Sequence, residues 1–363
     1  MLYTSITLAS TALVLPMLAI TIYNFFTIRR THQREEVIQN KVSILIPMRN
    51  EESNAKGAIG SALDQKFLPN LEIIARDDQS TDSTLKLIQQ ISDDRLSIQI
   101  GDALPDGWLG KNYAMSELAN SATGEYLIFL DADVRLSPNA VADSISLLEE
   151  LDLDYLSPYP RQLVGDFPSA LIQPLLQWSW FSTLPIRRSE KSLRRSTVVA
   201  NGQFFIVKRL AYKAVGGHTS IRDEVLDDLE LARLLRKHGF RGSVIDGSQI
   251  ATCLMYPKFT QLLQGYSKSQ WRAFGSNLGA VSAILFLILT SITPFAFAIS
   301  GDFLAASVSI GVITTRLLAA WKTKSVIWSS FLHPLSITIW IFIIIYSIVL
   351  KQRGLLQWRG RPL

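Results

Sequence analysis

Two carboxylates with a spacing suited to metal binding follow an apolar run near residue 130. Asp131 and Asp133 come directly after residues 126–130 (YLIFL) and are separated by one residue. On an extended backbone, residues i and i+2 point to the same side, so both carboxylates can converge on one hard cation. Mg²⁺ or Mn²⁺ suits such a site, because one or two carboxylates and substrate phosphate oxygens bind these ions. The alternative interpretation is a solvated turn.

A second acidic pair, Asp77 and Asp78, follows the apolar run 71–76 (LEIIAR) and precedes residues 80–84 (STDST). The second run is rich in side chains that cap helices, and helix capping accounts for it. Capping does not account for two adjacent carboxylates at the end of a strand. We expect this pair to accept hydrogen bonds from the N–H of a base or from ribose hydroxyls.

A third acidic pair, Asp227 and Asp228, lies near the start of the segment 224–238, whose leucine spacing predicts an amphipathic helix. Carboxylates in the first turn of a helix can act in chemistry. They can equally do no more than complement the positive end of the helix dipole. Both interpretations stay open from this segment alone.

Lys111 lies in residues 107–112 (GWLGKN), at the start of a further predicted helix. The segment is not a Walker P-loop, because Pro105 stands where that motif needs its first glycine and Asn112 replaces the Ser or Thr. Lys111 could still meet a diphosphate through its own charge and the helix N-terminus.

The elements that must position these residues alternate between strand and helix. This alternation predicts a parallel sheet with right-handed crossovers. In such a sheet, ligands bind beyond the carboxyl ends of the strands, which is where the polar clusters lie. The predicted strands are 42–47, 71–76, 96–100 and 126–130, and the predicted helices are 52–66, 81–92 and 112–122.

Long uncharged stretches flank this soluble region. No Asp, Glu, Lys or Arg lies in 1–28, 273–301 or 325–350. The basic residues after position 28 favour a retained N-terminal anchor with the following domain in the cytoplasm. We therefore expect a cell-membrane, multi-pass protein with three or four spans, the uncertain one being 303–321. The expected division is a transmembrane anchor at 1–28, a cytoplasmic domain at 29–272, two or three transmembrane helices at 273–350 and a basic tail at 351–363.

The segment 167–195 combines an apolar, proline-interrupted stretch with a basic flank. We interpret it as an interfacial element attracted to anionic lipid. The alternative is a core helix followed by a solvated basic loop.

The composition excludes several classes of protein. Charged residues make up about a quarter of 29–272, the usual share of a globular domain, which excludes disorder. The single Cys253 forbids an internal disulfide. The net charge of +5 is modest, and the basic clusters flank apolar segments, so we expect no nucleic-acid partner.

The ordered motifs resemble the family 2 glycosyltransferases, membrane-anchored enzymes of the GT-A fold that use nucleotide sugars. The resemblance implies an α/β GT-A domain with a mostly parallel central sheet and transmembrane helices at both ends. The GWLGK element, the apolar C-terminal helices and the closing residues 358–361 (WRGR) are similar to the subgroup that glycosylates carotenoids and related lipids. The matching pieces are SILIPMRNEE (43–52), IIARDDQSTDST (73–84), GWLGKNYA (107–114), GEYLIFLDADVRLSP (124–138), NGQFFIVKRLAYKAVGGH (201–218) and LDDLELARLLRKHGFR (226–241).

The resemblance implies roles for the polar residues at the strand ends. Asp131 and Asp133 correspond to the metal motif, with Asp133 as the more direct ligand. Asp228 corresponds to the general base, and Asp227 replaces the usual Glu before it. The residues implied to bind the nucleoside, which would be uridine or another base, are Pro47, Asn50, Glu51, Asp77 and Asp78, with Asp78 as the first choice.

The family's Gln-x-x-Arg-Trp motif is absent as such. Residues 264–272 (QGYSKSQWR) hold similar residue types in another order, with Trp271 and Arg272 as expected substrate-binding residues. This departure argues against a processive polysaccharide synthase.

The expected function is inverting transfer of a sugar, from a donor that is expected to be a UDP-hexose, to a hydroxyl or carboxylate of a membrane lipid such as a carotenoid. The expected partners are therefore a nucleotide-sugar donor, a lipid acceptor and the bilayer, with Mg²⁺ or Mn²⁺ as cofactor. The alternatives are a polyprenyl-phosphate sugar transferase, a polysaccharide synthase of the same family and a membrane module that only binds ligands.

Overall fold

The computed structural model describes residues 2–358, 361 and 362, so Arg359 and Gly360 of the closing WRGR lie outside the described residues. The chain forms two compact units. The sheet unit comprises Arg29–Arg161 and Arg188–Met255, and the helical unit comprises Met1–Ile28, Gln162–Arg187 and Tyr256–Leu363. Residues 162–187 and 256–272 of the expected domain 29–272 belong to the helical unit, and the expected division of the chain stays a prediction.

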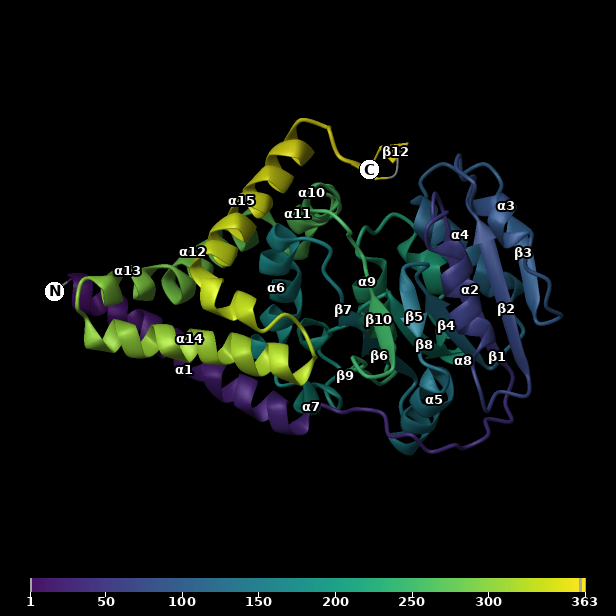
Figure 1. Cartoon of the computed structure of the whole chain (residues 1–363), viewed down its shortest axis with the longest axis horizontal. Helices are drawn as coiled ribbons and strands as arrows, with labels where there is room; N and C mark the ends of the chain where they lie inside the picture. The colour runs from purple at the N-terminus through teal and green to yellow at the C-terminus, as the bar shows by residue number, and fades with distance from the viewer. Residues whose placement is uncertain (1, 359–360, 363) are drawn as a thin grey trace. The chain divides into compact units, whose positions relative to one another are not determined.

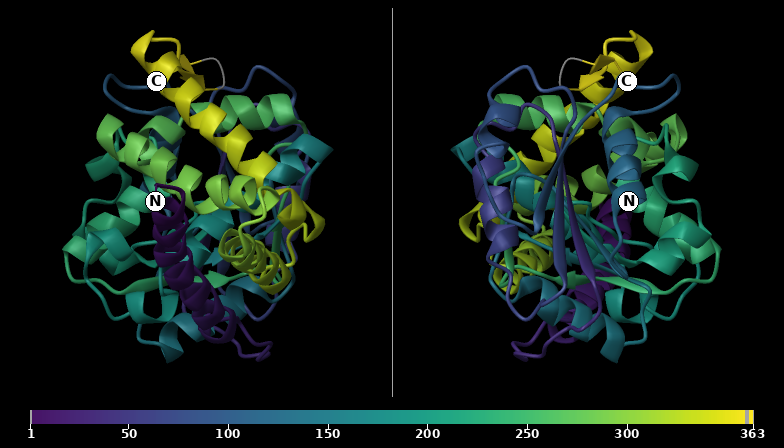
Figure 2. Two further views of the ribbon diagram at one scale, coloured as in Figure 1. Left: turned by 90° about the vertical axis from the view of Figure 1, so that its left-hand side faces the viewer. Right: turned by 90° about the vertical axis from the view of Figure 1, so that its right-hand side faces the viewer.

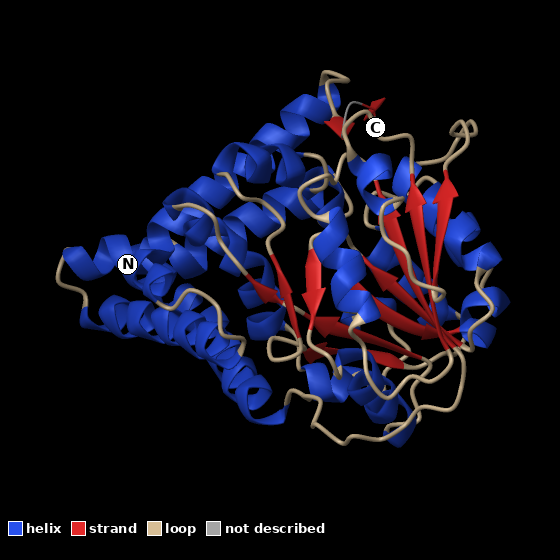
Figure 3. Cartoon of the chain, turned by 45° about the vertical axis from the view of Figure 1, so that its right-hand side comes forward, coloured by secondary structure: helices blue, strands red, loops and turns tan. Residues whose placement is uncertain are grey.

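A twisted sheet of seven strands is the centre of the sheet unit, within the residues described (Figure 3). Its order is β3-β2-β1-β4-β8-β6-β9. Strand β1 pairs in parallel with β2 and β4, and β2 pairs in parallel with β3, whereas β8 runs antiparallel to β4 and β6. The predicted mostly parallel α/β sheet is confirmed. The strands are β1 (Val42–Met48), β2 (Leu71–Asp77), β3 (Leu96–Ile100), β4 (Tyr126–Leu130), β6 (Tyr155–Tyr159), β8 (Phe204–Lys208) and β9 (Gly242–Asp246).

Helices cover both faces of this sheet (Figure 2). Side chains of a strand alternate between faces, so Ile44 and Ile46 of β1 pack with α2 and α5, whereas Leu45 packs with α4 and α9. Each face is dry and apolar, which holds the strand ends in fixed positions. The helices are α2 (Ala55–Leu63), α3 (Thr84–Ile88), α4 (Gly110–Ser121), α5 (Ala140–Glu150), α8 (Arg209–Ala214) and α9 (Asp227–Lys237), with 3₁₀ turns η1 (Arg195–Thr197) and η2 (Gly217–Ile221).

Three helices begin later than the sequence predicts. The first residues of the predicted helices 52–66 and 81–92 instead form a turn in which the N–H of Glu52 donates to Asp82 and the N–H of Ser83 donates to Glu52. The helix predicted from residue 224 begins at Asp227, because the carbonyl of Glu224 accepts a hydrogen bond from Asn112 outside the helix. Side-chain contacts between distant segments therefore replace the first turn of each predicted helix.

Short strands lie outside the main sheet. In one smaller sheet, β5 (Val134–Leu136) pairs antiparallel with β10 (Ala251–Cys253), with Val134 opposite Cys253. The remaining strands are β7 (Arg161–Gln162), β11 (Gln357–Trp358) and β12 (Arg361–Pro362).

The helical unit consists mainly of long apolar helices (Figure 1). Within the described residues, four segments are long and apolar enough to cross a membrane: Tyr3–Thr27, Asn277–Ile299, Phe303–Lys322 and Trp328–Gln352. One of them contains the segment 303–321, for which the sequence left a membrane crossing uncertain. The helices are α1 (Leu2–Thr27), α6 (Phe167–Thr183), α7 (Ile186–Ser189), α10 (Phe259–Ser267), α11 (Gln270–Ala273), α12 (Asn277–Ser291), α13 (Thr293–Ile299), α14 (Phe303–Lys322) and α15 (His333–Gln352), with the 3₁₀ turn η3 (Trp328–Leu332).

Helix α6 continues through Pro174 and packs against α1, α14 and α15. Its buried residues lie on all sides, as the core-helix alternative for this segment requires. The basic side chains that follow, such as Arg194 and Arg195, are exposed. An interfacial position of 167–195 stays a prediction.

Candidate active site

The loops after β1 and β2 are tied together by hydrogen bonds. The N–H of Asp78 donates to the carbonyl of Met48 at 2.7 Å, and Oδ1 of Asn50 accepts from the N–H of Thr81 at 2.8 Å. Asn50 adopts a left-handed conformation with φ 54°, which an Asn tolerates better than most residues. The N–H of Glu51 donates to Oγ1 of Thr84. The predicted residues of these two loops therefore lie side by side.

Both carboxylates of the second acidic pair are buried. Asp77 is 2% exposed and Asp78 is 5% exposed. Oδ2 of Asp77 accepts from the N–H of Ser80 at 3.1 Å, while Oδ1 of Asp77 is buried with no hydrogen-bond partner among the described residues. A buried acceptor without a partner is costly in a folded protein, so a ligand donor at this position would stabilise it. Pro47 lies in β1 opposite Arg76, and its role in substrate binding stays a prediction.

Asp131 and Asp133 follow β4 in different environments. The N–H of Asp131 donates to the carbonyl of Gln203, and its carboxylate meets Lys111. Asp133 is partly buried, and its buried Oδ1 has no hydrogen-bond partner in the described part of the chain. Burial, followed by the negative charges of Asp131 and Glu51, raises the pKa of Asp133 to about 7, against a lowering contribution from the Cys253 side chain.

This arrangement fits a divalent cation. A bound cation would add positive charge beside Asp133, whose pKa stays raised despite the nearby Lys111, and the carboxylate oxygens suit Mg²⁺ or Mn²⁺. Within residues 2–358, 361 and 362, no group of three or more His, Cys, Asp or Glu side chains forms a preformed metal cage. A site completed by substrate phosphate oxygens does not need such a cage.

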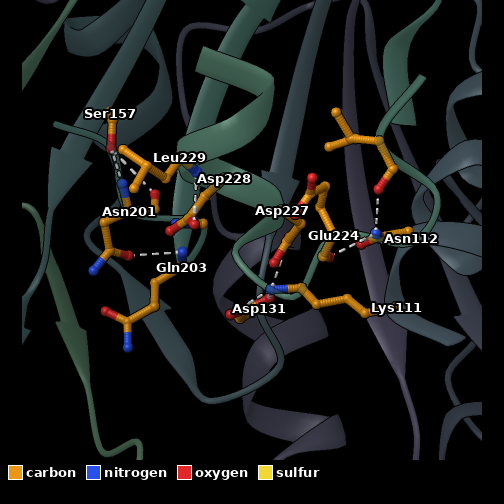
Figure 4. Close-up of polar contacts among 12 residues, drawn as sticks. Lys111, Asn112, Asp131, Ser157, Asn201, Gln203, Glu224, Asp227, Asp228 and Leu229 are labelled. Carbon is orange, nitrogen blue, oxygen red and sulfur yellow. Dashed lines mark hydrogen bonds and ion pairs between the residues drawn. The ribbon is translucent and has the colours of Figure 1, made fainter. Parts of the chain in front are cut away.

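Lys111 connects the end of β4 to the start of α9. Its Nζ lies 3.0 Å from Oδ1 of Asp131 and 3.4 Å from Oδ2 of Asp227. Burial would lower the pKa of Lys111, but the charges of Asp131, Asp227 and Asp228 raise it well above its ordinary value. The next residue, Asn112, donates to the carbonyls of Ile221 and Glu224 and so fixes the loop that leads into α9 (Figure 4).

Asp228 is held in place by two backbone N–H groups (Figure 4). The N–H of Gly202 donates to its Oδ2 and the N–H of Leu229 donates to its Oδ1, both at 2.7 Å. Burial, followed by the charge of Asp227, raises the pKa of Asp228 to about 6, against the lowering contributions of Lys111 and the two N–H groups. An acid with this pKa is largely ionised at neutral pH and can still accept a proton, as a general base must.

The segment 201–203 before β8 was not predicted as part of the site. A Cβ on Gly202 would lie 3.1 Å from Cβ of Asp228, which would have to move by a few tenths of an ångström, and at an ordinary 3.5 Å from Nζ of Lys111. The N–H of Asn201 donates to Oγ of Ser157, and its Oδ1 accepts from the N–H of Gln203. The only sequence signal was the glycine in NGQFF, which opens one of the matching motifs.

The sheet unit thus brings Lys111, Asp131, Asp227 and Asp228 together, with Asp133 next to Asp131. Trp271 lies in the helical unit. Its backbone N–H donates to Oγ of Ser347, and its ring centroid lies 3.8 Å from Nζ of Lys351. Arg272 lies in α11 of the same unit. A role for Trp271 and Arg272 in substrate binding stays a prediction.

Comparison with known proteins gives consistent results. Residues 43–216 match the model of Glycosyl transferase family 2. The chain is 24% identical to a 4,4'-diaponeurosporenoate glycosyltransferase of Staphylococcus aureus (strain bovine RF122 / ET3-1) over 355 residues, which is 92% of each chain. It is 23% identical to the protein of the same name from strain MRSA252 over 339 residues, 88% of this chain and 87% of that protein.

Among solved structures, the chain is similar to a mannosyltransferase from Pyrobaculum calidifontis in complex with GDP-Man and Mn²⁺. The TM-score is 0.53 and the sequence identity 17%, over 97% of this chain and 99% of that one. This similarity concerns the fold, which is that of the GT-A glycosyltransferases. The family match begins in β1 and ends after α8, so the region 43–216 of the sheet unit is similar to Glycosyl transferase family 2, and its fold is that of the GT-A glycosyltransferases.

Proposed function

We propose that this domain transfers a sugar, with inversion of configuration, from a nucleotide-diphosphate sugar to a hydroxyl or carboxylate of a membrane lipid. The observation that carries the proposal is the meeting of Lys111 with Asp131 and Asp227 beside the partly buried Asp228. The cation Lys111, the first aspartate of the predicted metal motif and the predicted base Asp228 therefore lie close together. A membrane module that only binds ligands would gain nothing from such closely packed carboxylates, which repel each other.

Asp228 would act as the base for a hydroxyl acceptor. Its carboxylate takes the hydroxyl proton while the acceptor oxygen forms a bond to the anomeric carbon on the side opposite the nucleotide. The bond from that carbon to the diphosphate breaks at the same time, and its electron pair leaves with the diphosphate. A positioned base of this kind contributes on the order of 10²–10⁴-fold to the rate.

Lys111 would face the diphosphate, where its ammonium stabilises the negative charge that grows on the leaving group. Asp131 and Asp133 would hold Mg²⁺ or Mn²⁺, which supplies further positive charge to the diphosphate when bound. The buried Oδ1 of Asp133, which has no hydrogen-bond partner among the described residues, supports this assignment. The mannosyltransferase of the same fold binds Mn²⁺ and GDP-Man.

The nucleoside would lie against the joined loops after β1 and β2. Asp78, Asp77, Asn50 and Glu51 line those loops, and the buried oxygens of the two aspartates suit the N–H of a base or the hydroxyls of ribose. We propose uridine as the base, following the family resemblance.

The acceptor would be an apolar lipid. Four helices able to cross a membrane support a membrane-bound acceptor, and the relatives named 4,4'-diaponeurosporenoate glycosyltransferase support a carotenoid-like one. We propose that the sheet unit faces the cytoplasm, where nucleotide sugars are made, because basic residues follow α1.

Product analysis tests this function. Membranes containing the full chain are incubated with a panel of labelled nucleotide sugars, and the extracted lipid is analysed by mass spectrometry. We expect one sugar on an apolar alcohol or acid. A sugar on a polyprenyl phosphate, a polymer, or efficient transfer to a soluble sugar alone would contradict the proposal.

A further inference from the structure

A buried arginine lies within the apolar helices of the helical unit. Arg316 is part of α14, in a segment long and apolar enough to cross a membrane, and is 1% exposed. A charged side chain inside such a segment is costly and usually pairs with another polar group. The groups around Arg316 therefore decide what compensates its positive charge.

No acidic side chain of this unit is available to Arg316. The unit has two, Asp166 and Asp302. Asp166 caps α6 and accepts from the N–H groups of Ser169 and Phe259. Asp302 caps α14 through Oδ1 and accepts from Thr7 through Oδ2. Neither makes an ion pair with Arg316 in the described part of the chain.

The groups around Arg316 are neutral or aromatic. Its Nη2 donates to Oγ of Ser329 at 3.3 Å, and its guanidinium carbon lies 5.9 Å from the ring centroid of Trp178. That ring is perpendicular to the imidazole of His333 at 4.9 Å. The indole N–H of Trp178 already donates a hydrogen bond to Oγ1 of Thr315 at 2.8 Å.

Several buried polar atoms of Arg316 and of the neighbouring segment 330–336 have no hydrogen-bond partner among the residues described. They are Nη1 of Arg316, both ring nitrogens of His333 and the hydroxyls of Ser330 and Ser336. Burying so many polar atoms without a hydrogen-bond partner costs several kcal/mol in total, on the order of 1–3 kcal/mol for each group. An oxyanion placed here would satisfy the guanidinium and several hydroxyl or imidazole donors at once.

We propose that Arg316, Ser329, Ser330, His333 and Ser336 form an anion site that takes the carboxylate or phosphate of a membrane lipid. The apolar surroundings favour a lipid over a free ion, because the acyl or polyene chain of a lipid can lie along the helices. The site stands independently of whether the bound lipid is the sugar acceptor.

The test compares lipids that differ only in charge. The full chain in neutral detergent is titrated with nitroxide-labelled stearic acid, with its methyl ester, and with hexadecyl phosphate as competitor. We expect the acid or the alkyl phosphate to bind about tenfold more tightly than the uncharged ester. Whichever of these two binds more tightly shows whether the site prefers a carboxylate or a phosphate headgroup. Equal affinities for acid, phosphate and ester would overturn the proposal, with water as the occupant of the site.

Variants connect the preference to this cluster. Arg316→Gln should abolish the preference for the charged lipid, and Arg316→Lys should keep part of it. Arg353→Gln removes an exposed cation at the end of α15 and should leave the preference unchanged. Circular dichroism checks the fold of each variant, and a folded Arg316→Gln protein that keeps the full preference would also overturn the proposal.

Discussion

The N–H of Gly202 donates a 2.7 Å hydrogen bond to Oδ2 of Asp228, although the two residues lie 26 positions apart in the sequence. The contact joins the segment before β8 to the first turn of α9 and fixes the direction of the carboxylate. Leu229 N–H holds the second oxygen at the same distance. Burial and the charge of Asp227 raise the pKa of Asp228 to about 6, although both hydrogen bonds lower it, so the carboxylate is largely ionised at neutral pH.

Gly202→Ala should reduce activity with little effect on folding. The new Cβ would lie 3.1 Å from Cβ of Asp228, which must shift, and a displacement of the base by a fraction of an ångström costs about tenfold or more in rate. The measurement is kcat together with the melting temperature. Gly60→Ala in α2 is the matched control, since a Cβ there meets nothing within 4 Å, and it should leave kcat unchanged. Equal kcat for both variants would show that Gly202 does not position Asp228.

The pH profile of kcat/KM with a hydroxyl acceptor should rise through about pH 6 and level off above it. Asp228 must be ionised to take a proton, and its pKa is raised from 3.8 to about 6. Asp227→Asn removes a negative charge that raises this pKa, so the acid limb should move to lower pH. Lys111→Met removes a positive charge that lowers it, so the limb should move to higher pH. Shifts in the same direction for both variants would contradict this electrostatic account.

Asp133→Asn should weaken the binding of Mn²⁺ by at least about tenfold, because the partly buried carboxylate is the expected direct ligand. The measurement is the titration of activity with Mn²⁺ after treatment with a chelator, together with Mn²⁺ binding followed by electron paramagnetic resonance. Cys253→Ser, which changes a neighbour of Asp133 without removing a carboxylate, serves as control. Unchanged Mn²⁺ affinity in Asp133→Asn would remove Asp133 from the metal site.

Glu72 should stabilise the sheet unit at neutral pH. Burial alone would raise its pKa, but hydrogen bonds from Ser43 (2.5 Å), Thr123 (2.7 Å) and Lys41 (3.0 Å) lower it from 4.5 to about 2. A lowered pKa stabilises the fold above about pH 4.5, and this stabilisation is lost as the pH falls from there to about 2.

Glu72→Gln should therefore lower the free energy of unfolding by about 2 kcal/mol at pH 7, allowing for partial solvent screening, and by much less near pH 2. Thermal melting at both pH values measures the difference. The exposed Glu36→Gln serves as control and should leave the melting temperature unchanged. Equal melting temperatures of Glu72→Gln and the unchanged protein at pH 7 would contradict the prediction.

The sequence predicted the strands that precede the site more accurately than the helices that follow them. Residues 126–130 form a strand with the predicted bounds, because a buried apolar run of this length has few other stable arrangements. Residues 96–100 also form a strand with the predicted bounds, at the edge of the sheet, where apolar and polar residues alternate. The start of α9 at Asp227 was not predictable, because it depends on the hydrogen bond from Asn112 to the carbonyl of Glu224. Such contacts between distant segments leave no periodic pattern in the sequence.

Contacts between distant segments also explain which site residues were predicted and which were missed. Asp131 and Asp133 were found because they directly follow a strand whose carboxyl end must face the ligand edge of the sheet. Gly202 was missed because its importance comes from the Cβ that it lacks, beside Lys111 and Asp228. The antiparallel β8 that carries this glycine to the site is likewise set by pairing with β4 and β6, which the local sequence does not reveal.

Asp228→Asn tests the central claim most directly, in a single preparation assayed for donor binding and for sugar transfer to a lipid alcohol. Asn keeps an oxygen that can accept the N–H of Gly202 but cannot take a proton. We predict that nucleotide-sugar affinity stays within about twofold of the unchanged protein, while transfer falls by on the order of 10²–10⁴-fold. Transfer at an undiminished rate, or loss of donor binding in a folded protein, would contradict the assignment of Asp228 as the base.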